Sequence, residues 1–124
     1  MSTSRAPFSR KSSAVRRMTI VPLAGLVQTE GVLAGTVHYL TANVIVIGGA
    51  PDNDIRLGDR EVSPHHACIR KSRAGNAVAF QIYDLASSSG VRVNGLTVAM
   101  RHPLAQGDRI TIGRAVLEFF VPTG

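Results

Sequence analysis

Short apolar stretches separated by turn-forming residues run along the chain from residue 19 to its end. They are rich in Val, Ile and Phe, which suit strands, and no window keeps a helical period for several turns. Many short strands at such intervals favour an all-β sandwich or barrel. The pattern predicts strands at residues 23–28, 36–40, 44–47, 54–57, 66–71, 78–85, 91–93, 109–112 and 116–121.

Alternation of polar and apolar side chains indicates how these strands are exposed. Phe80 and Ile82 share one face of their strand, whereas Gln81 and Tyr83 share the other. Residues 109–112 alternate in the same way. Such alternation is typical of antiparallel strands that have one face against the core and one face in water.

Residues 31–51 carry no charged side chain, and a stretch of this length raises the possibility of a transmembrane helix. Gly, Thr, His and Asn residues interrupt the stretch, and the run Val-Ile-Val-Ile at residues 44–47 favours a strand. We therefore expect two buried strands here, joined by a turn at residues 41–43.

The composition is that of an ordinary globular protein with one domain. The chain has 124 residues, of which 44% are hydrophobic and 18% are charged, so it can bury a core without a second folded unit. With 5% aromatic residues and no Trp, it is poorly suited to stacking nucleic-acid bases. We divide it into a flexible basic arm, residues 1–18, and a β-sandwich domain, residues 19–124.

Positive charge is concentrated in the arm. The net charge is +6, and residues 1–18 hold five of the fourteen Lys and Arg residues but none of the eight acids. The other nine cations stand against eight acids, so the rest of the chain is nearly neutral at +1. Such an arm is usually a solvated leader, and the alternative is a weak, salt-sensitive contact with nucleic acid or an anionic membrane.

The single cysteine, Cys68, excludes a disulfide within the chain and suits a reducing compartment. The basic start followed by the apolar residues 18–27 is similar to the first two parts of a signal peptide. However, Pro22 interrupts the apolar run and no clear small-x-small cleavage site follows. We expect a cytoplasmic protein and leave targeting open.

Catalysis and metal binding receive little support from the sequence. Ser63, His66 and Asp84 are the residue types of a nucleophile, base and orienting acid, but Ser63 lacks a Gly-x-Ser-x-Gly context. On a strand, His66 and Cys68 share a face while His65 points the other way, which leaves only two neighbouring metal ligands. The sequence predicts neither an enzyme nor a cofactor or metal site.

Two polar loops hold the remaining candidates. One contains Ser63, and the other runs Asp-Leu-Ala-Ser-Ser-Ser-Gly over residues 84–90. Serine hydroxyls and backbone N–H groups present several donors to an anion without bulk, and loops on a rigid sheet commonly carry function. Together the loops predict a small anion-binding patch suited to a phosphate on a peptide.

The chain from about residue 23 to residue 121 resembles a forkhead-associated (FHA) domain. The resemblance implies an eleven-stranded antiparallel β-sandwich of the SMAD/FHA type, without enzymatic activity, whose end loops bind a phosphothreonine in an extended partner peptide. The matching motifs are Ile-Gly at 47–48, Pro-Asp-Asn-Asp-Ile at 51–55, Val-Ser-x-x-His-Ala-x-Ile at 62–69, Asp-Leu-x-Ser-Ser-x-Gly at 84–90, Val-Asn-Gly at 93–95, and Leu-x-x-Gly-Asp-x-Ile-x-Ile-Gly at 104–113.

The resemblance also implies a role for individual residues. It implies that the hydroxyls of Ser63 and Ser88 bind the phosphate, and that Ser89 stands where the family contacts the peptide. The resemblance further implies that four residues fix the loops, namely Gly48, His66, Asn94 and Gly95.

The pocket departs from the family pattern at Gly49, where the family has an arginine. A hydrogen bond to a charged group contributes roughly 1.5–3 kcal/mol, so its loss is expected to weaken phosphate binding about tenfold to a hundredfold. Pro64 and Ser89 also replace residues that offer an amide side chain to the peptide. Arg60 precedes Ser63 in the same loop and is the expected compensating cation.

These observations favour a non-catalytic interaction module that binds a partner protein through a phosphothreonine peptide with weakened affinity. One alternative keeps the fold but drops phosphate, as a scaffold or an oligomer subunit. Another assigns the activity to the basic arm as an electrostatic tether to nucleic acid or membrane. The partner and the oligomeric state are left open by the sequence.

Overall fold

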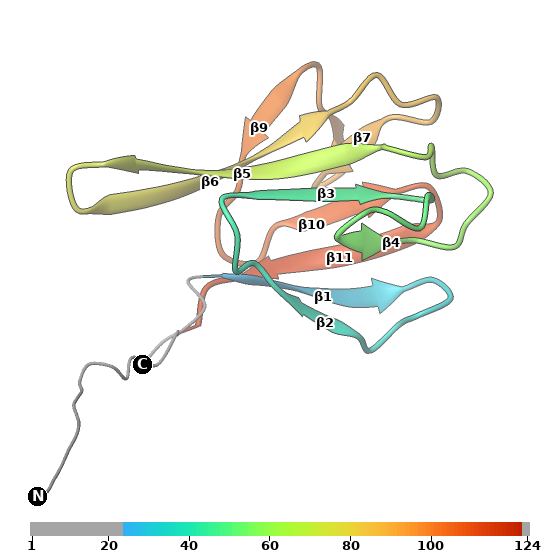
Figure 1. The fold of residues 1–124 in the computed structure, drawn as a ribbon, viewed down its shortest axis with the longest axis horizontal. Coiled ribbons are helices and arrows are strands. Elements are labelled where there is room, and N and C mark those ends of the chain that lie inside the picture. The colour runs from blue at the N-terminus through green and yellow to red at the C-terminus, as the bar shows by residue number, and fades with distance from the viewer. Residues whose placement is uncertain (1–23, 123–124) are drawn as a thin grey trace, which may run out of the picture.

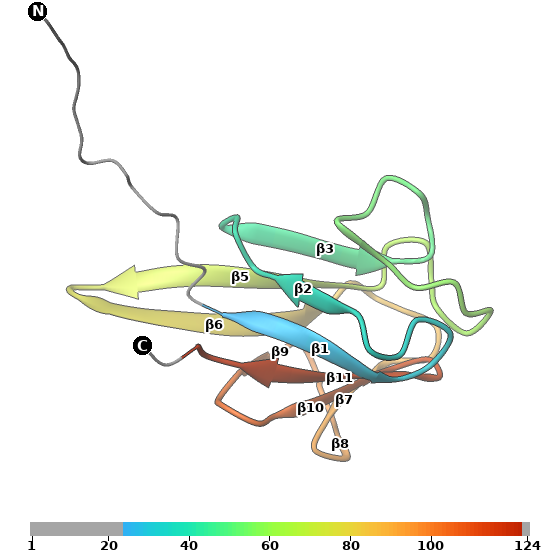
Figure 2. The ribbon, with the colours of Figure 1, turned by 90° about the horizontal axis from the view of Figure 1, so that it is seen from below.

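The computed structural model describes residues 24–122, and in this part of the chain eleven strands form two β-sheets that pack face to face (Figure 1 and Figure 2). The predicted arm, residues 1–18, lies outside the described residues, as does the start of the first predicted strand at residue 23. The two-sheet all-β architecture confirms the predicted fold class.

The first sheet has six strands, and every neighbouring pair in it is antiparallel. The strands do not lie in the order in which they follow one another along the chain, because β1 lies between β2 and the last strand, β11. Across the sheet the strands are β2 (Val37–Tyr39), β1 (Gly25–Glu30), β11 (Ala115–Phe120), β10 (Arg109–Ile112), β7 (Val91–Val93) and β8 (Leu96–Thr97).

The second sheet has five strands and contains one parallel pair, β3 with β4, beside antiparallel pairs. Across the sheet the strands are β4 (Ile55–Arg56), β3 (Val44–Gly48), β5 (Ala67–Ala74), β6 (Ala77–Asp84) and β9 (Arg101–Pro103).

The core lies between the sheets and is built from alternate residues of the strands. On β10, Ile110 and Ile112 are fully buried while Arg109 is exposed, as the alternation predicts. Phe80 of β6 and Phe119 of β11 join the two sheets, with ring centroids 5.6 Å apart. Removal of these apolar surfaces from water is the main force that holds the sheets together.

The sequence prediction omits β8 and β9, which are the outermost strands of their sheets. Both residues of β8 are exposed, and β9 contains Pro103. Strands of two or three mostly exposed residues are too short to show the alternation on which a prediction from sequence depends.

β5 continues to Ala74, beyond its predicted end at residue 71. It pairs with β6 along its whole length, and the resulting hairpin projects beyond the rest of the sandwich (Figure 1). Residues 72–77 at the end of this hairpin are all exposed. Because both faces of the projecting hairpin meet water, its polar sequence gives no strand signal.

Strands β2 and β3 occupy the uncharged segment at residues 31–51, as expected. The expectation that both are buried is wrong for β2, since Val37 and Tyr39 are 43% and 54% exposed. β2 is an edge strand of the first sheet and β3 belongs to the second, so residues 41–43 cross between the sheets. Within residues 24–122 there is no helix long and apolar enough to cross a membrane.

Candidate functional site

The two serine-containing loops meet at the end of the sandwich away from the tip of the β5–β6 hairpin (Figure 1). The hydroxyl oxygens of Ser63, after β4, and Ser88, after β6, lie 3.3 Å apart. The Ser88 backbone N–H also donates to the Ser63 hydroxyl at 3.1 Å. The structure therefore brings together the two hydroxyls that the sequence motifs single out.

The buried ring of His66 holds the two loops in this arrangement. It is fully buried, its Nδ1 accepts a hydrogen bond from the Ser63 backbone N–H at 3.0 Å, and its Nε2 lies 2.7 Å from the Gly90 carbonyl oxygen. A ring that accepts at Nδ1 and faces a carbonyl at Nε2 is neutral, with its proton on Nε2. One imidazole thus joins the loop of Ser63 to the end of the serine loop.

Local hydrogen bonds shape the serine loop so that Ser88 projects. The Ser87 backbone N–H donates to Oδ1 of Asp84 at 3.0 Å, and the Gly90 backbone N–H donates to the Ser87 hydroxyl at 3.0 Å. Ala86 adopts a positive φ of 56°, which an alanine rarely does. The resulting tight turn points the Ser88 side chain toward Ser63.

Ser89 connects the same two loops at a second point. Its hydroxyl donates to the Glu61 carbonyl oxygen at 2.6 Å, so this group is already engaged within the protein. Contact between Ser89 and a peptide stays a prediction. In the structure its side chain fixes the position of the loop that carries Ser63.

Gly48 allows the end of β3 to approach the Ser63 loop closely. A Cβ atom at residue 48 would lie 2.2 Å from the Pro64 carbonyl oxygen, which is far inside van der Waals contact. Next to it, the Gly49 backbone N–H donates to the Ser63 carbonyl oxygen at 2.9 Å, and the Ala50 N–H donates to that of Pro64 at 3.1 Å. These backbone contacts bind the end of β3 to the Ser63 loop.

Asn94 and Gly95 form the turn between β7 and β8, with positive φ values of 52° and 84°. The Asn94 side chain donates to Oδ1 of Asp108 at 2.9 Å and accepts from the Arg109 backbone N–H at 3.0 Å. These bonds join the β7–β8 turn to the start of β10, and a role of Asn94 and Gly95 in fixing the serine loops stays a prediction.

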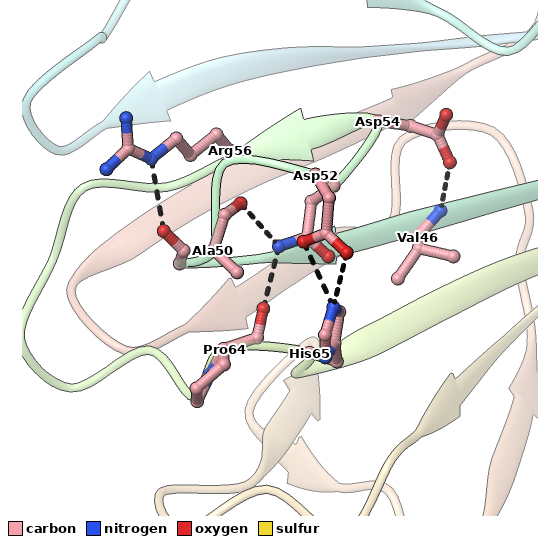
Figure 3. A network of polar contacts seen from close by, with 9 residues as sticks. Val46, Ala50, Asp52, Asp54, Arg56, Pro64 and His65 are labelled. Carbon is pink, nitrogen blue, oxygen red and sulfur yellow. Dashed lines mark hydrogen bonds and ion pairs between the residues drawn. The ribbon is translucent and has the colours of Figure 1, made fainter.

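A polar network holds the β3–β4 loop against the Ser63 loop (Figure 3). The Asn53 side-chain amide donates to the carbonyl oxygens of Ala50 and Pro64, both at 2.7 Å. Asp52 lies 3.2 Å from Nε2 of His65. The loop that contains Gly49 is therefore connected to the two residues that follow Ser63.

Two arginines line a cavity of about 430 Å³ between the β3–β4 loop and residues 57–64. One is Arg60, the cation expected from the sequence, whose side chain is exposed. The other is Arg56, whose Nε donates to the Gly49 carbonyl oxygen at 3.1 Å. The sequence prediction missed Arg56, because only the parallel pairing of β3 with β4 places it opposite Gly48.

Asp59 fixes the loop between β4 and Ser63. Its carboxylate accepts hydrogen bonds from the backbone N–H groups of Glu61 and Arg114. The Glu61 hydrogen bond lowers the pKa of Asp59 below its ordinary value, burial opposes this, and the backbone and charge of Arg114 add to the lowering.

A larger cavity, of about 820 Å³, lies beyond this loop, next to Val32 and Leu33.

The residues considered for catalysis have other roles in the structure. Both ring nitrogens of His66 bond to backbone groups, so the ring is not placed to accept the Ser63 hydroxyl proton. Asp84 binds the Ser87 backbone instead of His66. Burial raises the pKa of the Cys68 thiol, although the charge of Arg70 opposes this, and among the described residues no three potential metal ligands cluster.

A known family model matches the part of the chain that contains the motifs described above. A family model described as "FHA domain" covers residues 45–113, which is more than half of the chain. This range includes both serine loops, the β3–β4 loop and His66.

Two curated proteins and one solved structure show similar matches. The FHA domain-containing protein FhaB of Mycolicibacterium smegmatis is 36% identical over 95 residues, covering 75% of this chain and 57% of FhaB. The oxoglutarate dehydrogenase inhibitor of Corynebacterium jeikeium is 34% identical over 99 residues, covering 76% of this chain and 62% of the inhibitor. The chain therefore spans about three fifths of the length of these relatives.

The solved structure is described as "Structural and functional analysis of phosphothreonine-dependent FHA domain interactions". It superposes with a TM-score of 0.70 and 29% identity, over 82% of this chain and 98% of that chain.

Proposed function

The chain belongs to the FHA domain family, and from this premise we propose that its end loops bind a phosphothreonine residue in an extended peptide of a partner protein. FHA domains are non-catalytic modules that bind phosphothreonine peptides of partner proteins. The observation that supports the proposal for this chain is the 3.3 Å separation of the Ser63 and Ser88 hydroxyls.

The chemistry of these two hydroxyls suits a phosphate. The Ser63 oxygen accepts the Ser88 backbone N–H, so its own proton is available to an acceptor. Without a ligand the two hydroxyls contact each other, and a phosphate oxygen next to both would receive two hydrogen bonds. Hydrogen bonds to a charged acceptor are about twice as strong as neutral ones, which favours this exchange.

Preorganisation adds to the affinity. His66, the Ser89 hydroxyl and the Gly49 backbone each form a hydrogen bond with the Ser63 loop. A site whose donors are already in position loses little conformational entropy when the ligand binds. Gly49 is expected to lower the affinity for phosphate, because a glycine offers no cation. We therefore expect weaker binding than in a site with an arginine at this position.

The test measures binding of purified protein to peptides with a central phosphothreonine and randomised flanks, and to the same pool with threonine. A sequence selected from the phosphorylated pool is then titrated by fluorescence anisotropy. We expect the phosphorylated form to bind at least tenfold more tightly. Ser63→Ala should remove most of this preference, whereas Ser72→Ala, on the projecting hairpin, should leave it unchanged.

The same titration separates the proposal from a phosphate-independent scaffold on this fold. A scaffold would bind phosphorylated and unphosphorylated peptides equally and would tolerate Ser63→Ala. Equal affinity for the two forms of every selected sequence would refute phosphothreonine recognition.

A further inference from the structure

The cavity next to Gly49 occupies the space that a side chain at residue 49 would enter. A Cβ atom built on Gly49 would lie 3.2 Å from the Val62 carbonyl oxygen and 3.8 Å from that of Leu57. Val62 and Leu57 both line the cavity of about 430 Å³. The backbone of Gly49 does not have the positive φ that only glycine adopts easily, so backbone strain does not exclude a side chain there, although its Cβ would be in tight contact with the Val62 carbonyl oxygen.

Arg56 enters this space from the neighbouring strand. Its Nε donates to the Gly49 carbonyl oxygen at 3.1 Å, a contact drawn as a dashed line in Figure 3, and this bond fixes the start of the guanidinium group. Within residues 24–122, neither terminal nitrogen of Arg56 has a hydrogen-bond partner. The guanidinium is thus anchored at one nitrogen and retains donors for an anion.

The cavity borders the loop that carries Ser63. Val62 and Pro64, the residues on either side of Ser63, line the cavity. The Gly49 residue that anchors Arg56 through its carbonyl also bonds through its N–H to the Ser63 carbonyl oxygen at 2.9 Å. Arg56 and Ser63 are therefore linked through one residue, Gly49, which accepts from the Arg56 Nε and donates to the Ser63 carbonyl oxygen.

We propose that Arg56 replaces the cation missing at residue 49 and binds the phosphate group that Ser63 and Ser88 hold. This inference rests on the proposed function and adds the residue that supplies positive charge. Two-pronged donation by a guanidinium matches the geometry of phosphate oxygens, and one nitrogen already bound to the protein reduces the freedom lost on binding.

Arg60 lines the same cavity but suits the role less well. In the part of the chain that the structure describes, its side chain has no hydrogen-bond partner, so it must be ordered entirely by the ligand. Asp59 also lines the cavity, and its carboxylate opposes an anion, although it is bound by two backbone N–H groups. We therefore expect Arg60 to contribute less than Arg56.

The experiment compares charge-removing variants in the phosphopeptide titration. Arg56→Gln should weaken binding of the phosphorylated peptide about tenfold, which corresponds to about 1.4 kcal/mol, and should not change binding of the unphosphorylated form. Arg60→Gln should weaken it less. The matched control is Arg73→Gln, which removes the same charge near the far end of β5 and should leave affinity unchanged.

A second variant makes the test independent of any effect of Arg56→Gln on folding. Gly49→Arg should restore affinity at least tenfold in the Arg56→Gln background, and should improve the wild type by a smaller factor because Arg56 already supplies the charge. Arg56→Lys keeps the charge but loses the Nε contact, and we expect an affinity between those of wild type and Arg56→Gln.

Failure of this inference differs from failure of the proposed function. If Ser63→Ala weakens phosphopeptide binding but Arg56→Gln stays within twofold of wild type, the role of Arg56 is refuted and phosphothreonine recognition stands. Equal gains from Gly49→Arg in both backgrounds would also refute it. If wild type does not prefer the phosphorylated peptide, both proposals fall together.

Discussion

The Ser63 and Ser88 hydroxyls lie 3.3 Å apart although 25 residues separate them in the chain. Their positions depend on His66, which bonds to the backbone at Ser63 and at Gly90. The site is therefore a property of two loops held by one buried ring, and its binding and its stability should respond to different substitutions.

The first prediction is that Ser63 and Ser88 act together on one phosphate. Ser63→Ala and Ser88→Ala should each weaken phosphopeptide binding about tenfold, because each removes a hydrogen bond to a charged acceptor. The double variant should lose less than the product of the two single losses, since residues in direct contact are coupled. Isothermal titration calorimetry on the four proteins measures this, and strictly multiplicative losses would contradict it.

The second prediction concerns His66 and stability. His66→Ala leaves the Ser63 N–H and the Gly90 carbonyl without their partner and opens a buried cavity. We expect the free energy of unfolding to fall by about 3–5 kcal/mol. Chemical denaturation measures the change, and the control is His65→Ala, which removes an exposed pair with Asp52 and should cost less than about 1 kcal/mol. Similar losses for the two variants would show that His66 does not hold the loops.

The third prediction compares two adjacent glycines. Gly48→Ala places a Cβ 2.2 Å from the Pro64 carbonyl oxygen and should destabilise the domain by about 1–3 kcal/mol. At Gly49 the nearest atom to a new Cβ is the Val62 carbonyl oxygen, at 3.2 Å, so Gly49→Ala should cost much less. Thermal unfolding of both variants tests this, since about 1 kcal/mol shifts the Tm of such a domain by roughly 4–8 °C. Equal Tm values would contradict the close approach of β3 to the Ser63 loop.

The fourth prediction is a pH dependence from Asp59. Chiefly because of the Glu61 backbone hydrogen bond, the pKa of Asp59 in the folded protein lies below its ordinary value of 3.8. The charged carboxylate therefore stabilises the folded state above pH 3.8, and this contribution is lost as the pH falls through the lowered pKa.

Asp59→Asn should reduce the free energy of unfolding by about 1 kcal/mol at pH 7, and the difference from wild type should shrink toward pH 3. Denaturant titrations at several pH values measure the difference. A difference that stays constant from pH 7 to pH 3 would show that the charge of Asp59 does not stabilise the loop.

Most of the strands followed from the pattern of side chains, and the exceptions share a cause. β7 and β10 match the predicted ranges, because their residues alternate between core and water. β8 and β9 were missed, and β2 was expected to be buried but is exposed. All three lie at sheet edges, where strand formation depends on a neighbouring strand more than on the segment's own sequence.

Part of the candidate site could likewise be predicted from the sequence, and part could not. The motifs around Ser63 and Ser88 pointed to a shared pocket, and the structure places the two side chains together. Arg60 was the expected compensating cation because it is near Ser63 in sequence. Arg56 escaped notice because its approach to Gly49 depends on the register of two paired strands, which no local pattern records.

By itself, the sequence determined the all-β class, the buried face of most strands and the two loops that carry the serines, because these follow from local alternation and from short motifs. Only the tertiary structure decided which strands form the edges, that one neutral His66 joins both loops, and that Arg56 lies beside Gly49. The reason is physical: these contacts join segments distant in sequence, and they exist only once the burial of apolar side chains has brought the two sheets together.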